Sequence, residues 1–151
     1  MAVVSIEVRG GTELAQKLRK FGVALLDLSQ GMEEAGDYLT DFFSGEVFAS
    51  RGQVFGEPWA PLSSSYAAYK ARRWPGRPPL VKSGELMGSF KSTNTRLTAR
   101  VNNTAPHFPW IQEGTSRMPA RVVMKVDDTR ERQVVELIRS DISRHMEVSG
   151  V

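Results

Sequence analysis

The sequence contains no cysteine, which excludes disulfide bonds and thiolate metal sites. Its two histidines, His107 and His145, are too few for a histidine-rich metal site. No apolar run approaches the roughly 18 residues that a membrane-spanning helix needs. The first residues also lack the basic and apolar regions of a signal peptide. These absences predict a protein made and assembled in a cytoplasm, without a membrane partner and without a cofactor.

Motifs that carry a known chemistry are missing as well. There is no glycine-rich phosphate loop, no dinucleotide-binding glycine motif and no zinc-protease motif. The serines at 63–65 are candidate nucleophiles, but no nucleophile elbow surrounds them. Carboxylate pairs such as Glu33–Glu34 are adjacent in sequence, so their side chains do not converge on one site. We therefore expect no enzyme activity, no catalytic residues and no metal site.

What the chain does contain fits one ordinary domain, residues 1–151. The formal net charge is +3 and the sequence pI is about 9.4. Such a mildly basic balance permits contact with nucleic acid or with an acidic partner and requires neither.

The first part of the chain predicts a strand followed by a long helix. Val3 to Val8 alternates in the manner of a short strand, and Thr12 is a suitable N-cap. From there apolar residues follow steps of three and four without a slip, the pattern of a helical heptad seam. This helix is either continuous or broken near Gly31, with Ser29 capping its second half. The stripe consists of Leu14, Leu18, Phe21, Leu25, Leu28, Met32, Ala35, Leu39 and Phe42.

The rest of the chain predicts an irregular arm, a small sheet and a final helix. We name residues 51–90 the arm, and within it expect a short helix from Ser63 to Arg73. Residues 89–93 and 97–102 predict a hairpin, residues 102–104 a loop and residues 121–126 a last strand. A helix then starts near Asp128, whose spacing from Glu131 is that of a capping box. The expected fold class is α+β, with helices on a small antiparallel sheet.

The arm carries a basic-aromatic segment, residues 66–82, that contrasts with an ordinary linker. Three interpretations stay open: docking onto a protein, contact with nucleic acid, or a solvated loop. Trp, Tyr and Arg are enriched at protein–protein hot spots, whereas rings and cations can also stack on bases and hold phosphates. The residues concerned are Tyr66, Tyr69, Arg72, Arg73, Trp74 and Arg77, with Lys70 and Lys82 beside them.

Three spaced segments resemble one family. They are Gly56 to Ser63 (GEPWAPLS), Pro79 to Ser89 (PLVKSGELMGS), and Trp110 to Gly114 (WIQEG) followed by Pro119–Ala120–Arg121. Their order and spacing are similar to those of the virion morphogenesis, or tail completion, family of tailed bacteriophages, found in Mu-like and related phages. The resemblance covers nearly the whole chain. It departs from the family pattern at His107, Ile111 and Val122, where family members often have tyrosine, histidine and an aromatic residue.

The resemblance implies structural work in a virion. Members of this family join or finish heads and tails, and relatives with this architecture form rings at the neck or the tail end. It implies a closed ring of copies, a hexamer being favoured, together with other neck or tail proteins and non-specific contact with passing DNA. The alternative is a small nucleic-acid-binding domain that uses residues 66–82. The interface residues that the motifs carry over are Trp59, Pro61, Leu62, Ser63, Leu80, Gly84, Leu86, Ser89, Gln112, Gly114, Pro119, Ala120 and Arg121, to which we add Trp110.

Two hypotheses refine this interpretation. Trp59, Pro61 and Leu62 form an apolar cluster that we expect to pack the root of the arm onto its own domain or onto a neighbour. The cluster of Arg72, Arg73 and Arg77 is expected to line a ring lumen or to meet an acidic ring.

Overall fold

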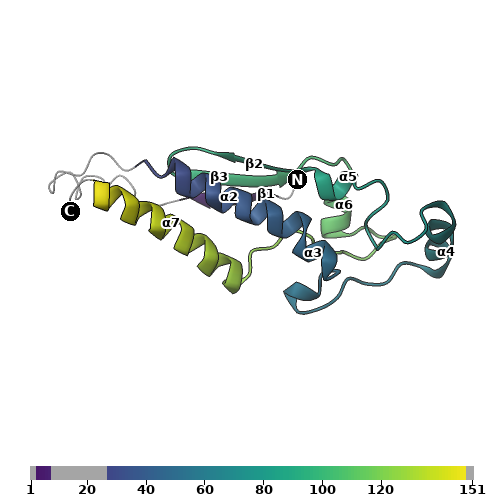
Figure 1. The fold of residues 1–151 in the computed structure, drawn as a ribbon. Helices are drawn as coiled ribbons and strands as arrows, with labels where there is room; N and C mark the ends of the chain where they lie inside the picture. The colour runs from purple at the N-terminus through teal and green to yellow at the C-terminus, as the bar shows by residue number, and fades with distance from the viewer. Residues whose placement is uncertain (1–2, 8–26, 149–151) are drawn as a thin grey trace. The chain divides into compact units, whose positions relative to one another are not determined.

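The computed structural model describes residues 3–7 and 27–148 (Figure 1). Its fold is α+β, as the sequence predicted, with a three-stranded antiparallel sheet in the order β1-β3-β2. The elements are β1 (Val3–Glu7), α2 (Ser29–Ser44), α3 (Glu46–Ala49), the 3-10 turn η1 (Gln53–Phe55), α4 (Ser64–Arg73), α5 (Glu85–Gly88), β2 (Phe90–Asn94), β3 (Thr98–Asn103), α6 (Phe108–Glu113) and α7 (Asp128–Val148).

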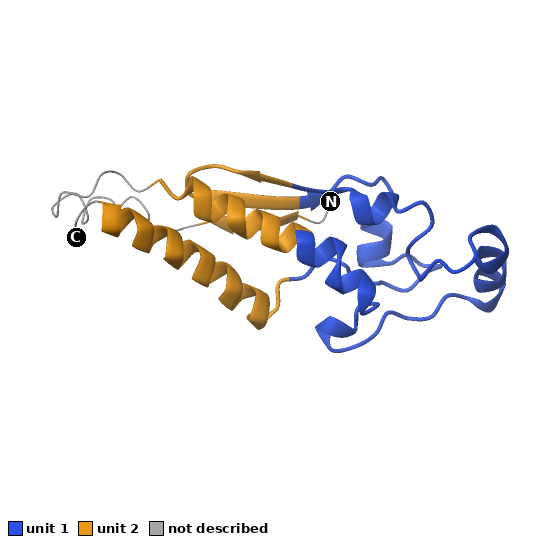
Figure 2. Ribbon diagram, viewed as in Figure 1, with its two compact units in different colours: residues 1–2, 41–91, 102–125 blue, residues 3–40, 92–101, 126–151 orange. Residues whose placement is uncertain are grey.

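The chain divides into two compact units, neither of which is continuous in sequence (Figure 2). Unit 1 contains residues 41–91 and 102–125, and unit 2 contains residues 3–40, 92–101 and 126–151, so α2, β2 and β3 contribute residues to both. The arm, residues 51–90, lies wholly within unit 1. A single domain spanning 1–151 stays a prediction.

Unit 2 is built from the sheet and from α2 and α7. Leu28, Met32 and Ala99 are fully buried and form its centre, with Ile6 and Ile138 packed around them. The period-two geometry of a strand explains this packing, because Ala99 and Val101 share the face of β3 that is buried. Strand Val3–Glu7 and the two hairpin strands lie within one or two residues of their predicted limits.

Helix α2 begins close to the predicted break near Gly31 but has a different capping residue. The chain is not helical at residues 27–28, and the helix starts at Ser29 rather than breaking at Gly31. The carboxylate of Asp27 accepts hydrogen bonds from the backbone N–H and the hydroxyl of Ser29, so Asp27 takes the capping role expected of Ser29. These bonds also hold the pKa of Asp27 below its usual value. The stripe positions before residue 27 lie outside the described residues.

Asp141 fastens α7 to the first turn of α2 inside unit 2. Its buried carboxylate accepts a hydrogen bond of 2.7 Å from the backbone N–H of Gly31. A carboxylate at this position satisfies a free N–H of the helix start and interacts favourably with the helix dipole. The Nδ1 of His145 donates a hydrogen bond of 2.8 Å to the backbone carbonyl of Asp141, and the His145 side chain is 33% exposed.

Unit 1 has an aromatic core. The ring centres of Phe43 and Phe90 are 5.8 Å apart, and those of Phe90 and Phe108 are 6.1 Å apart in an edge-to-face arrangement. Val81 and Leu86, both from the arm, are buried in this unit. The C-terminal part of the arm therefore contributes to the core instead of extending into solvent.

Three local predictions were wrong. Residues 121–126 form no strand, and residues 102–103 belong to β3 rather than to a loop. The cap of α7 is Asp127, whose carboxylate accepts from the backbone N–H of Arg130 at 2.8 Å, rather than Asp128. In place of a strand partner, the side chain of Gln112 binds the backbone of Val123 and Met124.

Candidate interaction surface

Trp59 anchors the start of the irregular part of the arm within unit 1. Its indole Nε1 donates a hydrogen bond of 2.8 Å to the carbonyl of Val122, and its ring packs edge-on against Phe48 at 5.4 Å between centres. Gly52 makes room for it: Gly52 has φ of 82°, and a Cβ there would lie 2.4 Å from Trp59 Cδ1. The cluster of Trp59, Pro61 and Leu62 was expected to pack onto its own domain or onto a neighbour. Trp59 packs within its own unit.

Arg121 fixes the next turn of the same segment. Its buried guanidinium donates from Nε to the carbonyl of Ala60 at 2.9 Å and from Nη2 to the carbonyl of Pro61 at 3.0 Å. Burial lowers the pKa of this guanidinium, which stays cationic at neutral pH. The forked geometry of arginine suits two neighbouring carbonyls, so one side chain holds two consecutive peptides of the arm.

Gln112 takes the place of the strand partner that residues 121–126 lack. Its Oε1 accepts from the backbone N–H groups of Val123 and Met124 at 2.9 and 3.0 Å, and its Nε2 donates to the Met124 carbonyl at 2.7 Å. The amide of one side chain thus satisfies backbone groups of Val123 and Met124 that a neighbouring strand would otherwise bind.

Gly114 lets this segment lie close to the end of α6. Its φ is 76°, and a Cβ at Gly114 would lie 2.7 Å from the backbone nitrogen of Ala120. Pro119 and Ala120 are exposed, while the backbone N–H of Arg121 donates to the carbonyl of Ile111 at 2.8 Å. We name Trp59, Gln112 and Arg121, with the backbone groups they bind, the frame.

The second motif segment contributes backbone shape and one core residue. Leu80 and Gly84 both have positive φ, 63° and 88°, and Leu86 is buried. The amide of buried Asn103 donates 2.8 Å to the carbonyl of Leu86 and accepts from the N–H of Ala105 at 2.9 Å. Ser89 donates to the carbonyl of Glu85 and so closes the last turn of α5.

Helix α4 forms where the sequence predicted it, with Ser63 as its N-cap. The Ser63 hydroxyl accepts from the N–H of Tyr66 at 3.4 Å, and the helix ends before Trp74 and Pro75. Figure 2 shows α4 projecting from the remainder of unit 1 on two long connections. Nine of its ten residues are exposed, and only Lys70 is buried.

Lys70 closes the loop that follows α4. Its ammonium donates to the carbonyl of Pro78 and, at 3.3 Å, to the carbonyl of Arg77. Burial lowers the pKa of Lys70, and the nearby cations Arg51 and Lys82 add to this effect. Lys70 was absent from the predicted interface residues, because a buried ammonium that binds carbonyls seven and eight residues away leaves no signal in the sequence.

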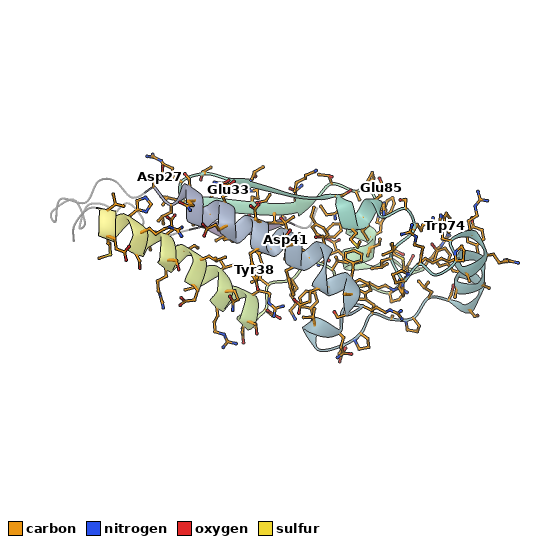
Figure 3. The ribbon with its side chains drawn as sticks, viewed as in Figure 1. Asp27, Glu33, Tyr38, Asp41, Trp74 and Glu85 are labelled. Carbon is orange, nitrogen blue, oxygen red and sulfur yellow. The ribbon has the colours of Figure 1, made fainter. Side chains whose placement is uncertain are left out.

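The rings of the basic-aromatic segment are exposed or half-buried and contact one another. Tyr69 lies 6.2 Å from Tyr66 and 5.9 Å from Trp74 between ring centres, and Tyr66 and Tyr69 are 37% and 47% exposed. The ammonium of Lys82 lies 4.6 Å from the ring centre of Trp74, which is labelled beside α4 in Figure 3. Arg72, Arg73 and Arg77 are exposed.

Two groups can be distinguished among the interface residues expected from the sequence. The frame brings together the first and third motifs, Trp59 to Pro61 and Gln112 to Arg121, by the hydrogen bonds described above. Tyr66, Tyr69 and the arginines belong instead to the exposed segment. Trp110 is 60% exposed on α6, and its backbone carbonyl accepts a hydrogen bond of 2.9 Å from the N–H of Gly114.

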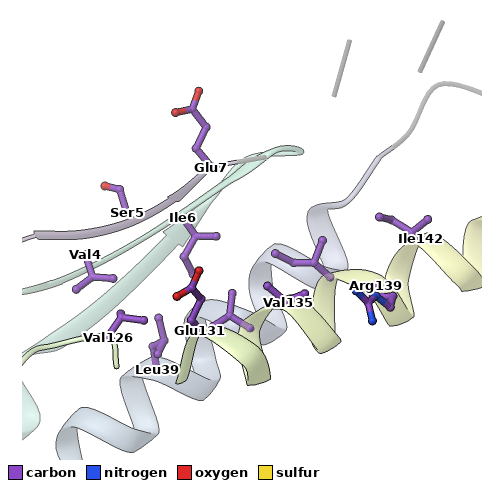
Figure 4. Close-up of a pocket in the computed structure, with 12 residues that line it drawn as sticks. Val4, Ser5, Ile6, Glu7, Leu39, Val126, Glu131, Val135, Arg139 and Ile142 are labelled. Atoms are coloured by element: carbon purple, nitrogen blue, oxygen red, sulfur yellow. The ribbon is translucent and has the colours of Figure 1, made fainter. Parts of the chain in front are cut away.

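A groove lies in unit 2 between β1 and α7 (Figure 4). Its volume is about 630 Å³, and its lining is mainly aliphatic. Val4 and Ile6 line it from β1, and Val135 and Ile142 line it from α7. The charged side chains among its lining are Glu7, Glu131 and Arg139. Such a surface favours apolar contact rather than polar chemistry.

Comparison with protein-family models, with curated proteins and with solved structures gave no match to this chain. Across residues 3–7 and 27–148, no three histidine, aspartate or glutamate side chains are grouped in a way that could hold a metal ion. In the same part of the chain, no helix combines the length and apolarity needed to cross a membrane.

Proposed function

We propose that this chain is a structural protein of a tailed-phage virion, located at the neck or the tail end, where copies of it form a ring during head–tail joining or tail completion. The observation that carries the proposal is the exposed α4, which displays tyrosines and arginines while burying only one of its ten residues. A helix this short is marginal in water by itself, so a surface that covers it would stabilise it.

The ordered motifs support the same proposal from a second direction. The first and third motif segments are remote in sequence, yet Arg121 binds the carbonyls of Ala60 and Pro61, and Trp59 binds that of Val122. Residues that resemble a family signature and also hold one another are what a shared fold would require. This reasoning supports the resemblance to the tail completion family and the virion location that follows from it.

The test is electron microscopy of lysates from a phage that carries this reading frame, with the frame silenced. Full heads beside separate tails of normal length would support a role at the junction. Tails of abnormal length would support a role at the tail end. Ordinary infectious particles would overturn the proposal.

Complementation with variants separates assembly from folding. Because Trp59 packs inside unit 1, Trp59→Ala is expected to destabilise the chain and is a poor probe of assembly. Tyr69→Ala removes an exposed ring and should lower particle yield while the circular dichroism spectrum stays unchanged. A matched control is Val148→Ala, which shortens a side chain that is 90% exposed in unit 2.

The second candidate function is a small nucleic-acid-binding domain. It is favoured by α4 itself, which has Lys70, Arg72 and Arg73 in its last turn and no carboxylate. That function requires DNA affinity that falls steeply with salt, whereas a virion ring requires weak, non-specific binding at most. Titration of labelled duplex at several salt concentrations distinguishes them.

A further inference from the structure

The small net charge of this chain conceals two stretches of opposite charge. Residues 58–84, which include α4, carry Lys70, Arg72, Arg73, Arg77 and Lys82 and no acidic residue. Residues 29–49, which include α2 and α3, carry Glu33, Glu34, Asp37, Asp41 and Glu46 and no basic residue. A near-neutral chain with separated charges has two surfaces that are complementary to each other.

On α2 the exposed carboxylates lie in a row. Glu33, Asp37 and Asp41 follow one another at four-residue steps, so they share one face of the helix, and all three are exposed. Within the part of the chain that the structure describes, none of the three has an ion-pair partner, whereas Glu34 pairs with Arg144. We name Glu33, Asp37 and Asp41 the acidic row; Figure 3 labels its two ends.

On α4 the exposed cations stand beside the exposed rings. Tyr69 precedes Arg72 and Arg73 by three and four residues, so the ring and the guanidinium groups share one side of the helix. Arginine stems and tyrosine rings bury apolar area while their polar ends bind carboxylates. The two surfaces also match in length: the acidic row spans about 12 Å of α2, and α4 is about 15 Å long.

We propose that α4 of one copy docks on the acidic row of a second copy, with Arg72 and Arg73 against Glu33 and Asp37 and with Tyr69 as the aromatic anchor. This inference rests on the proposed function, because a ring that closes on itself needs two complementary surfaces on the same chain. The partner of α4 is then another copy, and each copy offers its own α2 to the next.

Charge reversal on the full-length chain tests the docking. One variant carries Arg72→Glu and Arg73→Glu, and the other carries Glu33→Lys and Asp37→Lys. Each should weaken self-association at least about tenfold in sedimentation velocity at low salt, because like charges then meet at the contact. A matched control reverses two exposed charges elsewhere, Arg139→Glu with Glu136→Lys, which preserves their pairing in α7.

Mixing the two reversed variants is the decisive step. In the mixture, the unchanged basic arm of the Glu33→Lys, Asp37→Lys variant can bind the unchanged acidic row of the Arg72→Glu, Arg73→Glu variant. The acidic arm of the second variant can likewise bind the basic row of the first. Association should therefore return in the mixture to within about threefold of wild type, a recovery that repulsion without direct contact would not give. A single chain carrying all four substitutions should also associate, since its two surfaces have exchanged sign.

Each other outcome overturns the docking. If the four-substitution chain associates but the mixture does not, the two surfaces meet within one chain. If both reversed variants associate like wild type, copies meet elsewhere. Loss of duplex DNA binding in the arm variant, with self-association unchanged, would assign the arm to nucleic acid. A wild-type chain that stays monomeric throughout also overturns the docking, whereas the silenced-phage experiment decides the proposed function separately.

Discussion

The frame and the basic-aromatic segment lie in the same compact unit and use similar residues in opposite ways. In the frame, Arg121 is buried and both its bonds go to backbone carbonyls of its own chain. In the segment, Arg72 and Arg73 are exposed at the end of α4, in which Lys70 alone is buried. Trp59 and Tyr69 form a second pair of this kind, one tied to Val122 and the other open to solvent. The difference indicates that the frame maintains the fold and that the segment is available for binding.

The largest expected effect comes from removing the cation of the frame. Arg121→Met leaves the carbonyls of Ala60 and Pro61 without their donors, and should lower the free energy of unfolding by about 3 kcal/mol. Urea denaturation measures this value. Arg121→Lys is the informative companion, because a lysine keeps the charge but lacks the fork, so it should recover only part of the loss. If Arg121→Met lowered the free energy of unfolding less than Arg72→Glu with Arg73→Glu does, the frame would not be the part that maintains the fold.

Gln112→Glu should have the next largest effect. The substituted carboxylate still accepts from Val123 and Met124, but its second oxygen would face the Met124 carbonyl where Nε2 now donates. We expect a loss of about 2 kcal/mol at neutral pH, where the carboxylate is ionised. The loss should shrink on acidification, because a protonated carboxyl can donate to that carbonyl. Unfolding curves at two pH values test this, and an unchanged loss would show that the bond to Met124 contributes little.

Trp59→Phe probes a single bond of the frame. The ring contact with Phe48 is retained in part, whereas the hydrogen bond to Val122 is lost, so we expect a loss of about 1 kcal/mol. Thermal unfolding followed by circular dichroism gives the difference. Phe48→Leu serves as the control that removes the ring contact and keeps the hydrogen bond.

Lys70→Met should change the free energy of unfolding by a smaller amount, and this change should depend on pH. Because burial lowers its pKa in the folded state below 10.5, the folded chain releases the proton of Lys70 before the unfolded chain does as the pH rises. The cost of burying the ammonium is fully present at neutral pH and disappears as the pH rises toward 10.5. The unfolding free energy of wild type should therefore rise relative to that of Lys70→Met over the alkaline range. A difference that stays constant or falls with pH would be inconsistent with a buried ammonium.

The smallest effect on stability is expected in the exposed segment. Arg72→Glu with Arg73→Glu should change the unfolding free energy by no more than about 0.5 kcal/mol, because neither side chain is buried. Chemical denaturation is the measurement, and a change of the size expected for Arg121→Met would remove the distinction between frame and segment.

Local patterns predicted the elements that depend on local physics. The period-two alternation around Ala99 identified the hairpin, and the Ser63 cap with the proline after Trp74 set both ends of α4. The sequence failed where a distant side chain satisfies the backbone. Residues 121–126 are rich in valine and suggest a strand locally, yet the side-chain amide of Gln112, rather than a neighbouring strand, binds the backbone of Val123 and Met124. Nothing in a local window of sequence reveals such a distant partner.

The candidate site shows the same limit. Composition identified the basic and aromatic residues of the arm, but exposure separates Tyr69 from Trp59. The exposure of Trp59 depends on contacts such as its bond to Val122, which is 63 residues away in sequence. The acidic row could have been noticed, since Glu33, Asp37 and Asp41 follow the helical repeat in a stretch without basic residues. The adjacent carboxylates of Glu33 and Glu34 diverge, whereas the four-residue spacing places Glu33, Asp37 and Asp41 on one face of the helix.

The discontinuity of the two units has a consequence for biosynthesis. Unit 1 takes residues 41–91 and 102–125, so the bonds of Arg121 cannot form until nearly all of unit 1 has left the ribosome. The hairpin of β2 and β3, whose contacts are local, can form well before that point. Until Arg121 emerges, the exposed Tyr66 and Tyr69 are carried by a helix whose base is not yet secured. The two connections that carry α4 would thus be fixed late in synthesis, after most of the chain has been made.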